Sequence, residues 1–191
     1  MDRRVSRTKR LLKDALINLM REKEFDKITI KDLTDKADVN RATFYLHYKD
    51  KYDLIEQSSN EILVSISNII KEHSLNGIID NRDRNQVLEI LTNLYSYIKD
   101  NSDFMGVILG RNGDLSFQVK LKSLMDKIIC ESSYIGIKNK DRNVSIEYLT
   151  TIASSAQLGI IQKWIESGMK ESPRELALII SKVIVNITKD I

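Results

Sequence analysis

A stretch of 26 residues near the N-terminus, residues 29–54, constrains the fold more than any other part of the chain. Thr29 and Asp32 have the spacing of a capping box, in which two polar side chains hold the first turn of a helix. Asp38 follows the short helix that this cap predicts, and Asp tolerates the left-handed backbone of a tight turn. Asn40 is then a suitable N-cap for a second short helix. Two short helices joined by a tight turn predict a helix-turn-helix.

The second helix of this motif carries side chains that suit the recognition of double-stranded DNA. Polar residues lie at or near its N-terminus, the end that enters the major groove in such modules. Asn can pair with adenine, Arg with guanine, and the Thr methyl can contact the thymine methyl. We therefore expect base contacts from Asn40, Arg41 and Thr43. Side chains at the rim of the motif suit phosphate oxygens, and these are Thr29, Tyr45, His47 and Lys51.

The distribution of charge agrees with a DNA-binding N-terminal part. Residues 1–51 hold 14 Lys and Arg against 9 Asp and Glu, whereas the rest of the chain holds 16 against 18. The basic excess therefore lies on the segment that carries the motif. A helix is predicted from Thr8 to about Lys23, preceded by a polar arm that includes Arg3 and Arg4. Two roles fit this arm. It can contact DNA, along the phosphates or in the minor groove, or it can be a solvated tail.

The motif resembles the DNA-binding signature of the TetR family of bacterial regulators. Eight positions agree at the family's spacings, namely Leu33, Ala37, Val39, Tyr45, His47, Tyr48, Lys51 and Leu54. Two positions differ, because Thr34 stands where the family usually has Ala and Asp38 where it usually has Gly. The resemblance implies a helix-turn-helix domain of three helices followed by a helical ligand-binding and dimerisation domain. We place these domains at residues 1–50 and 51–191, in an all-α fold of about nine helices.

Composition supports the all-α interpretation, since the chain has a single Pro and seven Gly. A long helix is predicted from Lys51 to about Ser74, and the resemblance implies that it links the two domains. Aromatic side chains farther along the chain are candidates for lining a ligand pocket, namely Tyr95, Phe104, Phe117 and Tyr134. For any one of them, packing in the core is the simpler explanation.

The last two helices, predicted over residues 145–167 and from Pro173 onward, indicate a dimer interface. The final helix is apolar on nearly every side, so one core cannot easily cover it. A second copy of the chain is the simplest partner, and this matches the dimer mode of the family. The interface is predicted to comprise Ala153, Ala156, Gly159, Ile160, Ile180, Val183, Ile184 and Ile187. Residues 155–169 also resemble the C-terminal part of dihydroxyacetone-kinase operon regulators.

The sequence gives little support to an enzyme. It has two His and one Cys, and it lacks a nucleophile elbow, a phosphate-binding glycine loop and a metal-ligand cluster. We expect no catalytic residue, no metal and no cofactor. With no signal-peptide pattern and no long apolar run, we also expect a cytoplasmic location without membrane contact.

These features together predict a homodimeric transcriptional regulator, and a repressor in particular, that binds a near-palindromic operator in double-stranded DNA. An unknown small-molecule effector or a protein co-regulator would control it through the C-terminal domain. One alternative stays open, which is a TetR-fold adaptor or activator controlled mainly through a protein partner.

Overall fold

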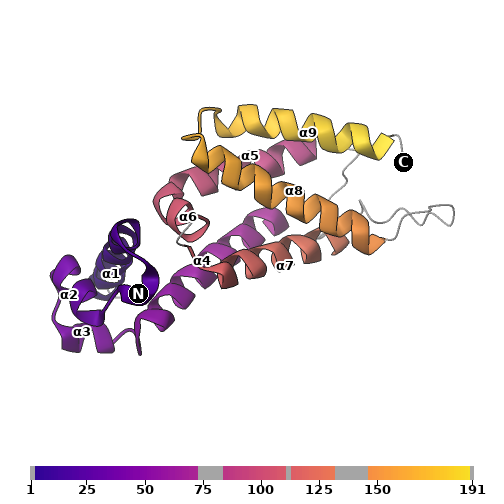
Figure 1. Cartoon of the computed structure of the whole chain (residues 1–191). Coiled ribbons are helices and arrows are strands. Elements are labelled where there is room, and N and C mark those ends of the chain that lie inside the picture. The colour runs from indigo at the N-terminus through magenta and orange to yellow at the C-terminus, as the bar shows by residue number, and fades with distance from the viewer. Residues whose placement is uncertain (1–2, 73–83, 111–112, 132–145, 190–191) are drawn as a thin grey trace. The chain divides into compact units, whose positions relative to one another are not determined.

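The computed structural model describes residues 3–72, 84–110, 113–131 and 146–189, and these form helices joined by turns (Figure 1). Nine α-helices and one turn of 3₁₀ helix lie in these ranges: α1 (Arg3–Glu22), η1 (Phe25–Lys27), α2 (Ile30–Ala37), α3 (Arg41–Tyr45), α4 (Lys51–Glu72), α5 (Arg84–Asp100), α6 (Ser102–Ile108), α7 (Leu115–Glu131), α8 (Ile146–Glu166) and α9 (Pro173–Lys189). The predicted all-α fold is confirmed. Among these helices, none combines the length and apolar character needed to cross a bilayer.

The chain forms two compact units. The first comprises residues 1–62 together with 103–117, and the second comprises residues 63–102 together with 118–191. The first unit therefore contains the whole helix-turn-helix, the first half of α4 and most of α6.

The core of the first unit is the apolar stripe of α1 packed over the helix-turn-helix. Five side chains at helical spacing form the stripe, and all of them are buried: Leu12, Ala15, Leu16, Leu19 and Met20. Ile28, Leu33 and Phe44 face it from the segments that follow and are 0–2% exposed. Because burying each such side chain contributes about 1.5–3 kcal/mol, this small core accounts for much of the unit's stability.

The N-terminal arm differs from the prediction. Helix α1 begins at Arg3 rather than at Thr8, so Arg3 and Arg4 lie on its first turn. Arg and Lys are good helix formers, and the Thr8 hydroxyl donates a hydrogen bond to the carbonyl oxygen of Arg4. Residues 3–7 hold a single apolar side chain, that of Val5, and so have no apolar stripe of their own. A helix that is already packed farther along the chain can extend through such residues.

Residues 103–117 join the first unit through contacts with α1. The ammonium of Lys13 lies 4.8 Å from the centre of the Phe104 ring, and burial lowers the pKa of this lysine. Arg21 forms an ion pair with Asp103. The Phe104 ring also meets Phe117 edge-on, with 6.2 Å between the ring centres. The start of α6 is thus fixed to the helix that supports the helix-turn-helix.

The second unit is built around α5, which packs along α9 (Figure 1). Tyr95 of α5 is fully buried, its hydroxyl accepts a hydrogen bond of 2.9 Å from Gln157 Nε2, and its ring lies edge-on to Trp164. Helices α8 and α9 run in opposite directions from the turn that joins them (Figure 1). Helix α9 begins with a capping box, since Ser172 and Glu175 exchange backbone-to-side-chain hydrogen bonds of 2.8 and 3.3 Å.

Candidate DNA-binding surface

The helix-turn-helix begins at a capping box that is also tied to α1. The Thr29 hydroxyl accepts a hydrogen bond of 3.1 Å from the backbone N–H of Asp32, and the Asp32 carboxylate accepts one of 2.8 Å from the N–H of Thr29. Lys23, just after α1, donates to the same carboxylate at 2.7 Å. The Lys23 ammonium, and then the two Thr29 donors, lower the pKa of Asp32 to about 2. One charged cluster therefore sets the position of α2 against α1.

The turn between α2 and α3 has the left-handed backbone that the sequence predicts. Asp38 has φ 52° and ψ 49°, and the N–H of Val39 donates to the carbonyl oxygen of Thr34 at 3.0 Å. Thr34 itself is buried, but its hydroxyl donates to the Lys31 carbonyl oxygen, so no hydrogen-bonding group is lost. Both departures from the family pattern are thus accommodated locally. Asn40 then caps α3 as predicted, accepting a 2.8 Å hydrogen bond from the N–H of Ala42.

Helix α3 presents one buried and one exposed face. Phe44 and Tyr48 are 0% and 4% exposed, and burial raises the pKa of Tyr48 to about 12. On the opposite face, Arg41 Nη2 donates to the Tyr45 hydroxyl at 3.2 Å, and the guanidinium lies 5.6 Å from the centre of the Tyr45 ring. Tyr45 is 47% exposed and Arg41 is also exposed. The pair forms a preorganised cationic surface on a helix held at its start by Asn40.

The three predicted base-contacting residues occupy different environments. Arg41 is exposed and can reach a base edge. Asn40 is exposed, but its Oδ1 already accepts the capping hydrogen bond, which leaves the amide nitrogen as the donor. Thr43 is half-buried. Their roles stay predictions, and the geometry favours Arg41 as the main reader of sequence.

Two of the four predicted phosphate contacts are engaged within the protein. Lys51 Nζ donates to the carbonyl oxygens of Phe25 and Asp26 at 3.0 and 2.7 Å, and it lies 4.9 and 5.2 Å from the ring centres of Phe25 and Tyr52. Thr29 is engaged in the capping box. Tyr45 is exposed and His47 is half-buried, and their contacts with phosphates stay predictions.

Two exposed residues next to α3 were not among the predicted contacts. Leu46 is 80% exposed, which is unusual for an apolar side chain, and Lys49 is exposed in the turn before α4. Helical spacing could have located Leu46, because Phe44 and Tyr48 point inward and Leu46 lies between them. Lys49 could have been found from its place between two elements of a basic segment. Both extend the candidate surface beyond Arg41 and Tyr45.

Three of the four predicted pocket residues lie among the described residues, and their role in a pocket stays a prediction. Phe104 and Phe117 pack against each other in the first unit, and Tyr95 is buried in the second. Tyr134 lies outside the described residues. The described part of the chain also holds no group of three or more His, Cys, Asp or Glu placed to bind a metal ion.

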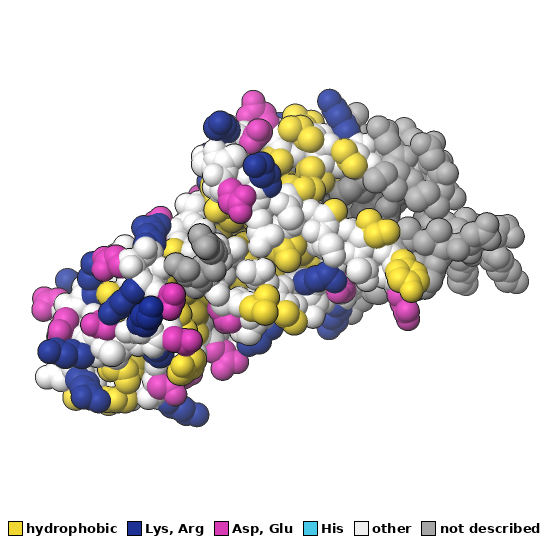
Figure 2. All heavy atoms as spheres, viewed as in Figure 1, with side chains coloured by type: hydrophobic (Ala, Val, Ile, Leu, Met, Phe, Trp, Pro, Cys, Tyr) yellow, Lys and Arg dark blue, Asp and Glu magenta, His cyan; other side chains and the backbone are white. Residues whose placement is uncertain are grey.

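The predicted dimer residues fall partly on an exposed face of α8 and α9. Ala156, Gly159 and Val183 are exposed, Ala153 and Ile160 are half-buried, and Ile180 is buried within its own unit. The side chains of Ile184 and Ile187 lie outside the described set. Three large apolar residues were not predicted and are more than half exposed, namely Tyr148, Ile152 and Ile179. Figure 2 shows hydrophobic side chains on α8 and α9 on the same side of the molecule.

Two family models match the chain. The first, described as "Bacterial regulatory proteins, tetR family", matches residues 12–57, which contain the helix-turn-helix. The second, described as "Transcriptional regulator C-terminal region", matches residues 85–186 and thus more than half of the chain. The chain belongs to the TetR family of transcriptional regulators. This agrees with the prediction that it is a regulator and not an enzyme.

One relative is also described as a transcriptional regulator of the helix-turn-helix type. The HTH-type transcriptional regulator YxbF of Bacillus subtilis (strain 168) is 40% identical over 82 residues, which are 39% of this chain and 22% of that relative. The chain therefore spans about a fifth of the length of YxbF.

Two solved structures show the same TetR fold. The dihydroxyacetone kinase operon activator DhaS covers 96% of this chain and 97% of its own at a TM-score of 0.61 and 17% identity. FadR from Bacillus subtilis, in complex with stearoyl-CoA, covers 92% and 96% at a TM-score of 0.63 and 15% identity. The similarity to DhaS agrees with the resemblance seen at residues 155–169, and at this identity it concerns the fold.

Proposed function

We propose that this TetR-family chain is a homodimeric repressor in the cytoplasm, binding a near-palindromic operator through residues 1–50 and receiving its signal through residues 51–191. The observation that carries the proposal is the Arg41–Tyr45 pair, exposed on α3 and held in a frame of capped helices. A rigid, exposed Arg at the N-terminus of a recognition helix suits the O6 and N7 atoms of guanine. The proposed reader of sequence is therefore Arg41.

The other proposed DNA contacts come from exposed or half-buried side chains near Arg41. The Asn40 amide nitrogen and the Thr43 methyl are proposed to contact bases beside Arg41, and Tyr45, His47 and Lys49 to contact phosphates. Arg3 and Arg4 are exposed on the first turn of α1, where they would add charge to the same surface. Phosphate contacts of this kind fix orientation and carry no sequence information of their own.

The homodimer rests on the apolar face of α8 and α9. Ile152, Ile179 and Val183 are 64%, 51% and 50% exposed, which is a large apolar area for a folded chain to leave in water. A two-fold copy would cover it and would set two α3 helices at a fixed separation. Such symmetry matches half-sites about one helical turn apart on DNA.

The signal is proposed to be a small molecule bound in the second unit, but a second candidate is a protein co-regulator. Leu115 and Val119, one turn apart on α7, are 71% and 58% exposed, and neither belongs to the α8–α9 face. An additional apolar surface of this kind favours the adaptor or activator alternative. Isolation of a stable heteromeric complex, together with no small molecule that changes DNA affinity, would support that alternative.

Selection of binding sites from a random DNA pool, at two salt concentrations, tests the proposed function. We expect an inverted repeat to be enriched, with affinity falling steeply as salt rises, because phosphate contacts release counterions. The same selection with Arg41→Ala should lose preference at one base pair of each half-site, at about 1–3 kcal/mol. Salt-sensitive binding without any enriched sequence would contradict the operator proposal.

A further inference from the structure

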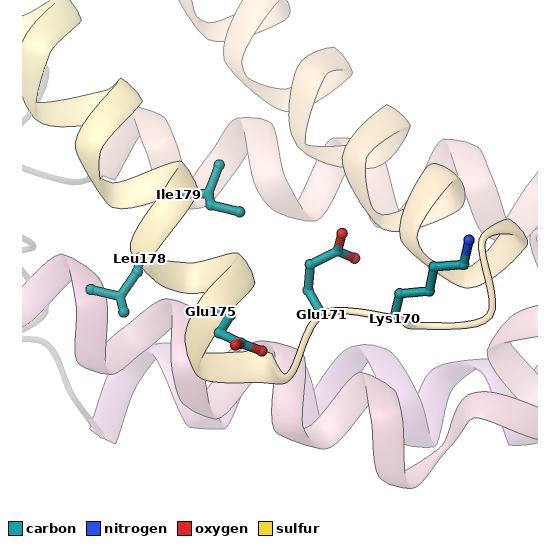
Figure 3. A pocket seen from close by; sticks show the side chains of 5 residues that line it. All are labelled: Lys170, Glu171, Glu175, Leu178 and Ile179. Atoms are coloured by element: carbon teal, nitrogen blue, oxygen red, sulfur yellow. The ribbon is translucent and has the colours of Figure 1, made fainter.

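Two features at opposite ends of α8 lie open to solvent, an aromatic side chain and a groove. Tyr148, on the first turn of α8, is 69% exposed, more than any other aromatic side chain that the structure describes. At the far end of α8, the turn into α9 borders an open groove of about 410 Å³. Its lining comes from that turn and from the first two turns of α9 (Figure 3): Lys170, Glu171, Glu175, Leu178 and Ile179.

The groove is held open by hydrogen bonds in the protein itself. Trp164 Nε1 donates to the Glu171 carbonyl oxygen at 3.0 Å, which fixes the turn to the buried end of α8. The Ser172–Glu175 capping box fixes the start of α9. A side chain entering the groove would therefore meet a preformed surface, and little ordering would be needed on binding.

The surface of α8 between these two features allows another helix to come close. Ala156 and Gly159 are exposed, and a Cβ added to Gly159 would meet no atom within 4 Å. Tyr148 precedes this small-residue region by about ten residues, or roughly 15 Å along the helix, and the groove follows it at about the same distance. If two α8 helices cross here about a two-fold axis, each Tyr148 comes to lie beside the groove of the other copy.

We propose that, in the homodimer, the Tyr148 side chain of each subunit inserts into the groove of the other. The ring would pack on Leu178 and Ile179, and the phenol hydroxyl would donate to the carboxylate of Glu171 or Glu175. The contact would occur twice by symmetry, and it is continuous with the apolar face formed by Ile152, Ile179 and Val183. The inference rests on the homodimer proposed above and names the contact that anchors it.

The dissociation constant of the dimer, measured by sedimentation of the full chain, tests this contact. Truncation of a buried interfacial Tyr commonly removes a large share of binding, so Tyr148→Ala should raise the dissociation constant about thirtyfold or more. Val119→Ala is the matched control, because Val119 is also exposed and apolar but lies on α7. It should dimerise like the wild type, and circular dichroism should show both variants equally helical.

A charge exchange distinguishes insertion into the groove from a general loss of apolar area. Tyr148→Glu would bring a carboxylate beside Glu171 and Glu175, so it should weaken the dimer more than Tyr148→Ala does. Adding Glu171→Lys to Tyr148→Glu should lower the dissociation constant of the dimer at least tenfold relative to Tyr148→Glu alone. A wild-type dimer that tolerates both Tyr148 variants would overturn the contact and leave the homodimer standing. A wild type that stays monomeric at every concentration would overturn both.

Discussion

At the scale of single residues, Lys51 shows that a charged side chain in a DNA-binding motif need not be free for DNA. Its ammonium bonds to two backbone carbonyl oxygens of η1 and lies close to the rings of both Phe25 and Tyr52. These contacts join the 3₁₀ turn to the start of α4. Lys49, two residues earlier, has an exposed side chain, and its backbone N–H donates a hydrogen bond to the Asp53 carboxylate.

The two lysines should therefore respond differently to truncation. We expect Lys51→Ala to lower the free energy of unfolding by about 1–2 kcal/mol, because two carbonyl groups lose a charged donor. Lys49→Ala should leave stability unchanged within about 0.5 kcal/mol. It should instead weaken binding to every DNA sequence alike and reduce the salt slope by about 1. Thermal or denaturant unfolding and DNA titrations at several salt concentrations measure both effects. Equal stability of the two variants would contradict the structural role of Lys51.

Asp32 makes the stability of the helix-turn-helix depend on pH. Its pKa is lowered from 3.8 to about 2, so the folded state favours the ionised carboxylate. A lowered pKa stabilises the folded protein above the ordinary value, and this contribution is lost as the pH falls through 3.8 toward 2. Wild type should therefore lose its stability advantage over Asp32→Asn across that window. Unfolding midpoints of the wild type and Asp32→Asn, measured between pH 6 and about 2, check this prediction. A constant difference between the two midpoints over this range would contradict it.

At the scale of elements, the positions of the helices could be predicted from local chemistry. Caps at Thr29, Asn40 and Ser172 are set by the residues around them, so the starts of α2, α3 and α9 agree with the sequence. The start of α1 was predicted at Thr8 instead of Arg3, because the basic residues before Thr8 carry no apolar stripe. Contacts between distant segments, such as Lys51 with η1, depend on packing that the pattern does not encode.

The turn between α2 and α3 offers a test of backbone strain. Asp38 has φ 52°, a region that Gly enters without the steric cost that a Cβ brings. Asp38→Gly should therefore stabilise the protein by up to about 1 kcal/mol, offset in part by the greater freedom of Gly in the unfolded chain. Asp38→Val should destabilise it by about 1–3 kcal/mol, since a β-branched residue is strained at this φ. Denaturant unfolding of the pair measures the difference, and a stabilising Val would contradict the argument.

At the scale of the whole molecule, the candidate site was only partly predictable. The recognition helix was predicted from its turn and cap, and the two helices of the proposed interface were predicted from their apolar patterns. The sequence did not locate Tyr148 or Ile152, since exposure depends on how each helix is rotated in the folded unit. Ile180 and Ile179 illustrate this, because adjacent apolar residues face inward and outward respectively.

Ile152→Asp tests whether dimerisation and DNA binding are linked. Ile152 is 64% exposed on the proposed interface, so an Asp there leaves the fold intact but puts a charge where two subunits would meet. The variant should unfold like the wild type yet sediment as a monomer. On a selected inverted repeat its affinity should fall at least about a hundredfold, because joining two half-sites multiplies their affinity. On a single half-site it should match an isolated wild-type subunit. If Ile152→Asp were monomeric and still bound the inverted repeat like the wild type, each subunit would act alone, and the two-fold operator would have no physical basis.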